Sequence, residues 1–311
     1  MSVALSADNQ NLVIAEGKRL RVLDLVGDAP ARDLLGHSDT VRFIAMQSDG
    51  ARMASCSQDR TVIVWKAGSW NMERILAGHD GVVRQVHLAA DMLLSCSSDE
   101  TVRLWNLETG RCKFVLKGHG TDVRGCAMSL DGSVGYSCGF DKKVRKWDLA
   151  TGKQTAALSG HTDKVFGVAT AADGSWALSC SWDKTLRLWD AQRQAGAAEP
   201  EATGALLTMV SPSEPAAVEA SDQGKEMLCV ALTGDGSRVV SCSVDGAVRI
   251  WDAESAEQLH KCTGHTDWVW GLSVTLDGAR AASCSRDFTA RVWDVREGRE
   301  VWQPIAVSVQ P

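Results

Sequence analysis

The sequence predicts an all-β protein in which seven copies of one small sheet close into a ring. The first observation is a tryptophan that ends a strand-like run, such as TVRLW or TLRLW, six times along the chain. These residues are Trp65, Trp105, Trp147, Trp189, Trp251 and Trp293, and their separations are 40, 42, 42, 62 and 42 residues. A nearly fixed period of this length is typical of a chain built from repeated structural units.

Two further markers keep the same period. Gly-His pairs precede five of the six tryptophans, with the histidines at His37, His79, His119, His161 and His265. Asp-Gly pairs lie inside five units, with the aspartates at Asp49, Asp131, Asp173, Asp235 and Asp277. An Asp-Gly pair between two apolar runs predicts a tight turn, so each of these units contains a hairpin of antiparallel strands. In the unit that ends at Trp105, the turn is two residues shorter.

A seventh copy of the unit is degenerate. The position 42 residues before Trp65 is Leu23, which lies in the run RLRVLDL. Apolar residues occupy both faces of such a unit, as Val102 and Leu104 show beside Trp105. A small sheet cannot bury both of its faces alone, whereas sheets that stack in a ring bury all of them. The sequence therefore predicts seven stacked sheets.

The recurring Gly-His pairs, together with tryptophans that Asp follows in four units, resemble the WD-repeat family. The resemblance covers nearly the whole chain. It implies a seven-bladed WD-repeat β-propeller in which each blade is a four-stranded antiparallel sheet. We therefore expect residues 1–311 to form a single propeller domain.

The resemblance also implies a hydrogen-bonded chain inside each blade, made by a histidine, a strand serine, a turn aspartate and the tryptophan. Five units carry the full set: His37, Ser55, Asp59, Trp65; His79, Ser95, Asp99, Trp105; His119, Ser137, Asp141, Trp147; His161, Ser179, Asp183, Trp189; and His265, Ser283, Asp287, Trp293. The sixth unit lacks the Gly-His pair, and the first has Gly17 and Leu23 where Asp and Trp would stand. We expect these two blades to be the least stable.

Serine, histidine and aspartate are also the residue types of a nucleophilic catalytic site. Five equivalent copies argue against that interpretation, because catalysis needs one pocket whereas a structural brace is needed in every blade. The sequence contains neither a phosphate-cradling Gly-rich loop nor a His-Glu-x-x-His zinc pattern. We expect no catalytic residue, no cofactor and no metal site.

Six of the ten cysteines are periodic, each one position after a strand serine: Cys56, Cys96, Cys138, Cys180, Cys242 and Cys284. Cysteine is small and often buried, so tight packing beside the central strands is the favoured interpretation. A ring of metal ligands is the alternative, and it lacks the clustered spacing that metal coordination requires.

Composition and charge exclude other classes of protein. The chain has 33 Lys and Arg against 39 Asp and Glu, a net charge of −6 and a pI near 5.7, so general nucleic-acid binding is not expected. Neither a basic leader nor an apolar run of roughly 20 residues is present, so we expect neither secretion nor membrane insertion. Ten cysteines without a Cys-x-x-Cys pair predict reduced thiols and a cytoplasmic protein.

The separation between Trp189 and Trp251 exceeds the period by 20 residues. The excess falls within residues 193–225, which contain three of the six prolines among Ala, Glu and Ser. Such a composition cannot bury enough apolar surface to hold one conformation, so it predicts a mobile loop between the fifth and sixth blades. Residues 205–210 are a candidate for the outer strand of the fifth blade. The loop is either a tolerated insertion or a tether for a partner.

The repeat pattern continues in register from the last residues of the chain to the first. We expect residues 300–302 to form the last outer strand, and residues 305–309 to pair near residues 3–5. Closing the ring in this way would hide strand edges that otherwise promote aggregation.

Counting along each unit places arginine and aromatic residues unevenly around the face of the ring that docks peptides in the WD-repeat family. The predicted partner-binding residues are Arg42, Arg84, Arg124, Phe140, Phe166, Trp182, Trp268, Trp270 and Arg286. Aromatic and arginine side chains dominate binding energy at the centre of interfaces, and arginine pairs with carboxylates and phosphates. In the alternative interpretation, the aromatic residues pack on neighbouring loops and the arginines are solvated.

The sequence therefore predicts a non-catalytic scaffold or adaptor that docks proteins or peptides, acidic or phosphorylated ones included. One alternative is a structural subunit of a larger ribosomal, ciliary or ubiquitin-ligase assembly, which predicts stoichiometric co-purification. A remote alternative is a propeller enzyme with a site in the central channel, which predicts turnover that depends on a channel-lining side chain.

Overall fold

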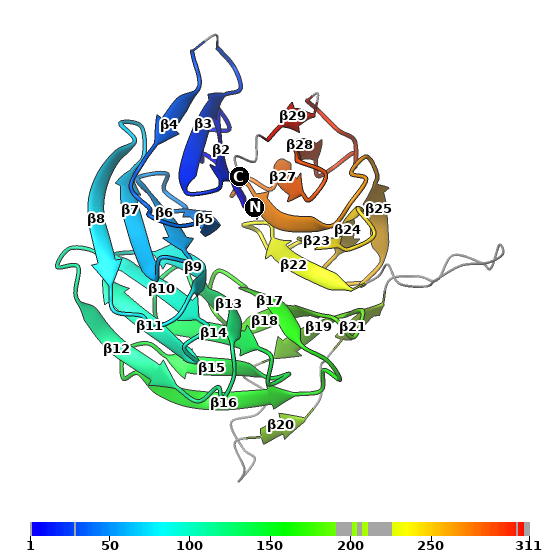
Figure 1. Cartoon of the computed structure of the whole chain (residues 1–311). Coiled ribbons are helices and arrows are strands. Elements are labelled where there is room, and N and C mark those ends of the chain that lie inside the picture. The colour runs from blue at the N-terminus through cyan, green and yellow to red at the C-terminus, as the bar shows by residue number, and fades with distance from the viewer. Residues whose placement is uncertain are drawn as a thin grey trace.

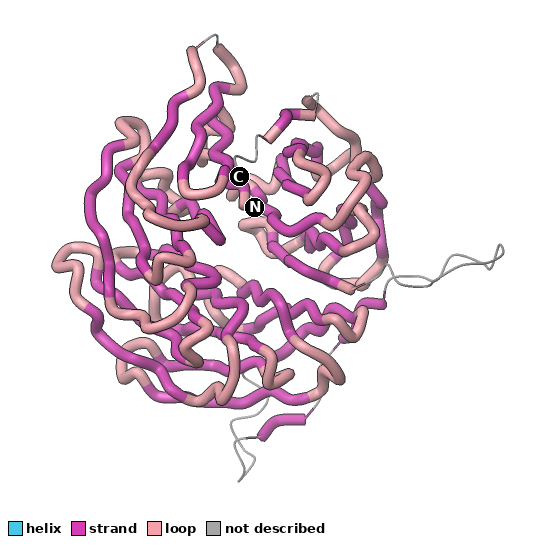
Figure 2. The backbone as a smooth tube through the Cα atoms, viewed as in Figure 1, coloured by secondary structure: helices cyan, strands magenta, loops and turns pink. Residues whose placement is uncertain are grey.

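Seven antiparallel sheets surround a central axis in the computed structural model, which describes residues 2–27, 29–190, 201–203, 207–210, 226–302 and 304–307. The sheets are arranged as the blades of a ring in Figure 1. Figure 2 shows only strands and loops in the described part of the chain. The prediction of an all-β, seven-bladed propeller with four-stranded antiparallel blades is confirmed.

The first three blades follow the chain in order, with the first strand nearest the axis and the fourth at the periphery (Figure 1). Blade 1 consists of β1 (Val3–Leu5), β2 (Asn11–Glu16), β3 (Arg19–Asp24) and β4 (Arg32–Leu34). Blade 2 consists of β5 (Val41–Met46), β6 (Arg52–Ser57), β7 (Thr61–Lys66) and β8 (Asn71–Ala77). Blade 3 consists of β9 (Val83–Ala89), β10 (Met92–Ser97), β11 (Thr101–Asn106) and β12 (Cys112–Lys117).

The other four blades have the same order of four antiparallel strands, and blade 4 carries a fifth strand at its outer edge. Blade 4 consists of β13 (Val123–Met128), β14 (Val134–Gly139), β15 (Val144–Asp148), β16 (Lys153–Ser159) and β20 (Glu201–Thr203). Blade 5 consists of β17 (Val165–Thr170), β18 (Trp176–Ser181), β19 (Thr185–Asp190) and β21 (Leu207–Val210). Blade 6 consists of β22 (Met227–Leu232), β23 (Arg238–Ser243), β24 (Val248–Asp252) and β25 (Gln258–Cys262). Blade 7 consists of β26 (Val269–Val274), β27 (Arg280–Ser285), β28 (Thr289–Asp294) and β29 (Ile305–Ala306).

The Asp-Gly turns connect the first and second strands of their blades. Their glycines have φ angles between 66° and 73°, a region that glycine adopts at little cost. In blade 4 the Asp131 carboxylate also accepts hydrogen bonds from the Ser129 hydroxyl (2.6 Å) and the Ser133 backbone N–H (3.0 Å). In blade 3 the shorter turn places Ala90 at a φ of 47° instead. The turn residues therefore fix the register of each inner hairpin.

The hydrophobic core lies between the blades. One cluster joins Val64 of blade 2 to Leu88 and Trp105 of blade 3, and equivalent clusters join the blades that follow. The periodic cysteines contribute to these clusters and are at most 1% exposed. Cys138 is packed so closely that a Cβ built on Gly125 would lie 2.8 Å from its Sγ. Each blade is thus buried on both faces only because its neighbours cover it.

Residues 193–225 supply two strands to the outer edges of neighbouring blades. β21 pairs antiparallel with β19, and it provides the outer strand of blade 5 from within the expected residues 205–210. β20 pairs in parallel with β16 and adds a fifth strand to blade 4, which the sequence did not indicate. The rest of the segment predicted to be a mobile loop lies outside the described residues.

Ring closure differs from the prediction. β29 pairs with β28, with Thr289 opposite Ala306, whereas residues 305–309 were expected to pair near residues 3–5. Residues 300–302 were expected to form the last outer strand, but they contribute only a single bridge, from Glu300 to Trp293, which covers one end of β28. The outer strand is β29, which pairs with the other end of β28. The predicted pairing was wrong because this unpaired half of β28 needed backbone partners.

Side-chain packing closes the ring at this junction. Val307 is 3% exposed and belongs to one cluster with Val3 of blade 1 and Val292 of blade 7. Blades 7 and 1 therefore meet face to face, like the other neighbouring blades, with β1 and β29 held in separate sheets. No helix within the described ranges is long and apolar enough to span a bilayer.

Candidate partner-docking site

A hydrogen-bonded brace occupies the interior of five blades. In blade 2 the Trp65 indole N–H donates to Ser55 Oγ (2.9 Å), which lies 2.9 Å from His37 Nε2. The other ring nitrogen, Nδ1, lies 2.8 Å from the Asp59 carboxylate. The consistent assignment is a neutral histidine that donates from Nδ1 to Asp59 and accepts at Nε2 from the Ser55 hydroxyl.

The same three contacts recur in the other four blades that carry the full set of residues. The His Nδ1 to Asp distances are 2.7, 2.9, 2.7 and 2.9 Å for His79–Asp99, His119–Asp141, His161–Asp183 and His265–Asp287. The His Nε2 to Ser Oγ distances are 2.8, 2.8, 2.7 and 2.8 Å for His79–Ser95, His119–Ser137, His161–Ser179 and His265–Ser283. The Trp Nε1 to Ser Oγ distances are 2.8 Å for Trp105–Ser95, Trp147–Ser137, Trp189–Ser179 and Trp293–Ser283.

Burial sets the protonation state of the brace. It lowers the pKa of His119, His161 and His265, because the charged imidazolium would lose its hydration. Burial alone would raise the pKa of Asp287, but hydrogen bonds from Thr289, Thr266 and His265 outweigh it and lower that pKa to about 2. In the braces of His119, His161 and His265, a neutral histidine and an ionised aspartate are therefore the stable pair at neutral pH.

The brace serines do not fit a nucleophilic role. Ser55, Ser95, Ser137, Ser179 and Ser283 are all 0% exposed. Each hydroxyl is already held between an indole N–H and an imidazole. A nucleophile has to be accessible to its substrate, and these serines are not. Their hydrogen bonds stabilise the fold instead.

Blade 6 lacks the brace histidine, and an arginine that sequence reasoning overlooked holds its turn aspartate instead, through Ser243 and not through the serine that accepts from the tryptophan. The Arg249 guanidinium donates to Ser243 Oγ (2.8 Å) and to the Asp245 carboxylate, and the whole residue is 4% exposed. Trp251 still donates to Ser241 (2.9 Å). Arginine recurs at this strand position in other blades, so its spacing alone did not single out blade 6.

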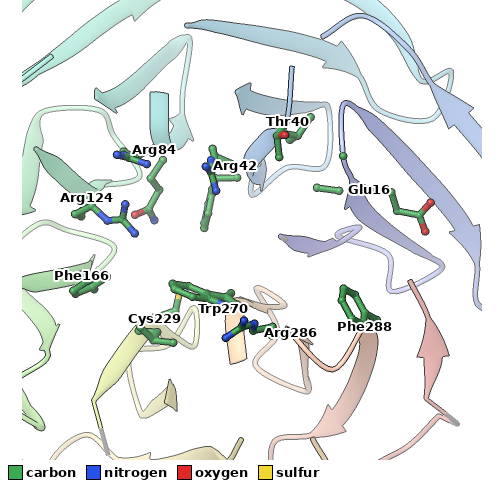
Figure 3. Close-up of a pocket in the computed structure, with 16 residues that line it drawn as sticks. Glu16, Thr40, Arg42, Arg84, Arg124, Phe166, Cys229, Trp270, Arg286 and Phe288 are labelled. Atoms are coloured by element: carbon green, nitrogen blue, oxygen red, sulfur yellow. The ribbon is translucent and has the colours of Figure 1, made fainter. Parts of the chain in front are cut away.

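A pocket of about 650 Å³ opens at the mouth of the central channel. The first strands of the blades begin at this face, and the turns between second and third strands end on it. Six of the nine predicted partner-binding residues line the pocket: Arg42, Arg84, Arg124, Phe166, Trp270 and Arg286. Figure 3 shows Arg42, Arg84 and Arg124 on one side of the opening, with Trp270 and Arg286 across from them.

The other three predicted residues lie beside the pocket. Phe140 packs against Phe166 with ring centroids 5.5 Å apart, and Trp182 stacks on Phe166 at 4.7 Å. Trp268 packs against Trp270 at 5.4 Å. The aromatic residues therefore form two groups, one around Phe166 and one around Trp270.

The arginines of the mouth have different partners. Arg84 pairs with both oxygens of Asp122, with N–O distances of 3.2 and 2.7 Å. Arg124 lies over the ring of Phe166, 4.9 Å from its centroid. Burial lowers the pKa of Arg42 and of Arg124, and the positive charge of Arg84 lowers both further.

Ten of the sixteen lining residues were not among the predicted partner-binding residues, and Glu16, Gln85 and Phe288 are three of these. Phe288 is 50% exposed at a φ of 62°, directly after the turn aspartate Asp287. Counting one position past each turn aspartate would have found it. Glu16 lies in the degenerate first blade, where no repeat marker fixes the count.

Six segments of the chain match the WD40 family (WD domain, G-beta repeat): residues 29–66, 70–106, 110–148, 152–190, 219–252 and 256–294. These segments cover most of the chain, so the chain belongs to this family. Each of the first four begins near the fourth strand of one blade and ends at the third strand of the next. WD40 propellers are typically protein-interaction scaffolds without catalytic activity.

Individual relatives match over short stretches. The intraflagellar transport protein 122 homolog of Homo sapiens is 41% identical over 63 residues, which are 20% of this chain and 5% of that protein. The Mus musculus protein of the same name is 40% identical over 63 residues, with the same coverage. An uncharacterized WD repeat-containing protein of Synechocystis is 33% identical over 90 residues, 29% of this chain and 26% of that protein. The matches thus span from a twentieth to about a quarter of these relatives.

Proposed function

We propose that this WD40 propeller is a non-catalytic docking scaffold that holds a protein partner over the pocket at the mouth of its channel. The observation that carries the proposal is the meeting of four arginines with Phe166 and Trp270 in one cavity of about 650 Å³. Partly desolvated arginine and aromatic side chains are the residues that contribute most to binding at interfaces. We further propose that the protein acts in the cytoplasm, as its ten unpaired thiols suggest.

The two faces of the ring allow a matched test. Arg124 and Trp270 lie on the pocket face, whereas Arg111 and Trp176 lie at the connections on the opposite face. We would purify the tagged full chain from cells of its source organism and quantify co-purified proteins for wild type, Arg124→Ala, Trp270→Ala, Arg111→Ala and Trp176→Ala. Circular dichroism and a thermal melt establish that each variant is folded.

The proposal predicts that stoichiometric partners fall at least about 10-fold with Arg124→Ala or Trp270→Ala, the loss expected of an interface hot spot. The same partners should remain with Arg111→Ala and Trp176→Ala. Partners retained by both pocket-face variants and lost from an opposite-face variant would refute the docking proposal.

A ciliary assembly subunit is a second candidate, supported by the 63-residue match to the intraflagellar transport protein 122 homolog. The two candidates differ in the size of the complex that contains the protein, because a subunit of a large assembly contacts several neighbouring subunits at once. Sedimentation of native extracts tests it: the assembly subunit migrates in a large, salt-stable complex that survives Arg124→Ala. The docking scaffold migrates in a small complex that this substitution dissolves.

A further inference from the structure

We propose, on the basis of the docking function above, that the pocket binds a phosphorylated side chain of the partner and places its phosphate between Arg42 and Arg124. The occupant is thus a peptide segment with a phosphate ester, held at the channel mouth by guanidinium groups from blades 2 and 4, on either side of blade 3. The proposal stands on the charge count of the pocket, on the way its arginines are held, and on its apolar wall.

The charge count leaves two positive groups without a close carboxylate. Five charged side chains line the pocket: Glu16, Arg42, Arg84, Arg124 and Arg286. Glu16 lies 2.8 Å from Arg19 and 3.8 Å from Arg21, so its charge is balanced from outside the pocket.

Two of the four lining arginines have an acidic partner on their own face. Arg84 is neutralised by Asp122, and Arg286 lies 3.9 Å from Asp267 at the exposed rim. Among the described residues, no carboxylate lies within 4.0 Å of Arg42 or Arg124. These two side chains therefore bring two uncompensated positive charges to one mouth.

This arrangement of positive charges carries an electrostatic cost. Burial lowers the pKa of Arg42 and Arg124, and the neighbouring arginine charges lower them further, while Asp39 and Asp122 act in the opposite direction from longer range. The Arg42 Nε is buried and has no hydrogen-bond partner within the described ranges. An anion that enters the mouth relieves the repulsion and satisfies the unused donors.

Two unpaired guanidiniums match a phosphate ester better than a carboxylate. A phosphorylated side chain carries a charge of about −1.5 to −2 at pH 7 and three acceptor oxygens, whereas Asp and Glu carry a single charge. Each arginine presents a planar fork of donors that fits two oxygens of a phosphate. A phosphate between Arg42 and Arg124 thus balances the excess charge, and a carboxylate leaves one positive charge unpaired.

The pocket wall suits the remainder of a phosphorylated peptide. Arg124 lies over Phe166 (4.9 Å) and Phe140 (5.5 Å), so two rings support the guanidinium from behind and limit its motion. Phe166 and Trp270 line the same pocket and offer apolar surface to residues that flank the phosphate. A positive group fixed on an aromatic wall is preorganised for an anionic ligand.

The test uses the full-length protein and a fluorescent peptide library with one fixed central residue. Three libraries carry phosphoserine or phosphothreonine, unmodified serine or threonine, or glutamate at the centre. Binding is measured by fluorescence anisotropy for wild type, Arg42→Gln, Arg124→Gln, the double variant and the control Arg111→Gln on the opposite face. Comparing the three libraries on the wild-type protein needs no variant. It therefore tests the preference for phosphorylated peptides even if a substitution impairs folding.

We expect the phosphorylated library alone to bind the wild-type protein. Each single substitution should weaken that binding about 10-fold and the double substitution about 100-fold, as expected for lost charge-assisted hydrogen bonds. Arg111→Gln should bind as the wild type does.

Three results overturn the phosphate proposal. They are equal binding of the glutamate and phosphorylated libraries, binding that the double variant retains, and the absence of binding by the phosphorylated library. The docking proposal is judged separately by Trp270→Ala: if that variant loses its partners while phosphate has no effect, docking stands and phosphate recognition fails.

Discussion

At the scale of the residue, one serine hydroxyl in each of five blades satisfies two buried partners at once. Ser179, for example, accepts from the Trp189 indole and donates to His161, at distances of 2.8 and 2.7 Å. The histidine in turn holds Asp183, which caps the turn that follows the strand. A buried polar chain of this kind is stabilising only when every member is paired, so its residues act as a unit.

We expect Ser179→Ala to destabilise the propeller by about 2 kcal/mol, because it leaves the Trp189 indole and one nitrogen of His161 unpaired in the interior. Ser38→Ala is the matched control, since Ser38 is exposed. Urea unfolding followed by tryptophan fluorescence measures both variants. Equal midpoints for the two variants would show that the brace contributes nothing to stability.

Acidification should weaken the protein in two stages. The pKa of His119, His161 and His265 is lowered in the folded state, so below pH 6.5 the unfolded chain binds protons more readily and stability falls. The pKa of Asp183 and Asp287 is also lowered, so their contribution is present above pH 3.8 and is lost as pH falls toward the folded value, about 2 for Asp287.

Urea unfolding at a series of pH values from 8 to 3 tests the expected decline. The free energy of unfolding should fall between pH 7 and pH 5 and fall again below about pH 4. Stability that stays constant or rises on going from pH 7 to pH 5 would contradict the assignment of neutral, buried histidines.

The periodic spacing of residues was enough to predict the five braces, but it did not predict the role of Arg249. His, Ser, Asp and Trp recur at fixed spacings, so each brace could be assigned from the sequence once the period was known. The role of Arg249 in blade 6 could not be assigned in this way, because blades that do have the brace histidine also carry an arginine at the equivalent strand position. Only the contacts of its guanidinium with Ser243 and Asp245 show that Arg249 holds the turn of this blade.

At the scale of the element, the strands follow the repeat, and the differences from prediction lie where the repeat stops. The inner hairpins were predicted from turn residues, and β21 fell within the expected outer strand of blade 5. The pairings of β29 with β28 and of β20 with β16 were not predicted. An outer edge accepts any segment that can satisfy its backbone groups, so the pairing depends on chain geometry more than on side-chain pattern.

The junction of blades 7 and 1 is the element most open to test. Val307→Asp should destabilise the protein by about 3 kcal/mol, because it places a charge among Val3, Leu5 and Val292. Ala306→Asp, one position earlier on the exposed side of β29, is the control. Melting temperatures by calorimetry compare the two, and equal values would mean that this packing does not hold the ring closed.

That blades 1 and 6 are the least stable of the seven stays a prediction. In blade 1, β4 has only three residues, two of them exposed. In blade 6, Arg249 holds the turn aspartate Asp245, although it bonds Ser243 and not Ser241. Blade 1 is therefore the better candidate for the weakest element.

At the scale of the whole molecule, the ring gathers residues that are far apart in sequence onto one face. Arg42, Arg124 and Trp270 come from three blades, and the equivalent start of the first strand brings each of them to the channel mouth. This convergence could be predicted, since equivalent positions in a ring of repeats share one face. The pairing of Arg84 with Asp122 and the depth of the pocket could not, because they depend on side-chain conformations.

The most direct test of the central claim, that function lies on the pocket face, is hydrogen–deuterium exchange of the full chain with and without a co-purified partner. The account predicts partner-dependent protection at the starts of β5, β9, β13 and β26 and in the turn that contains Arg286. Protection confined to the outer strands β8, β12 and β16, or to the turns of the opposite face, would contradict it.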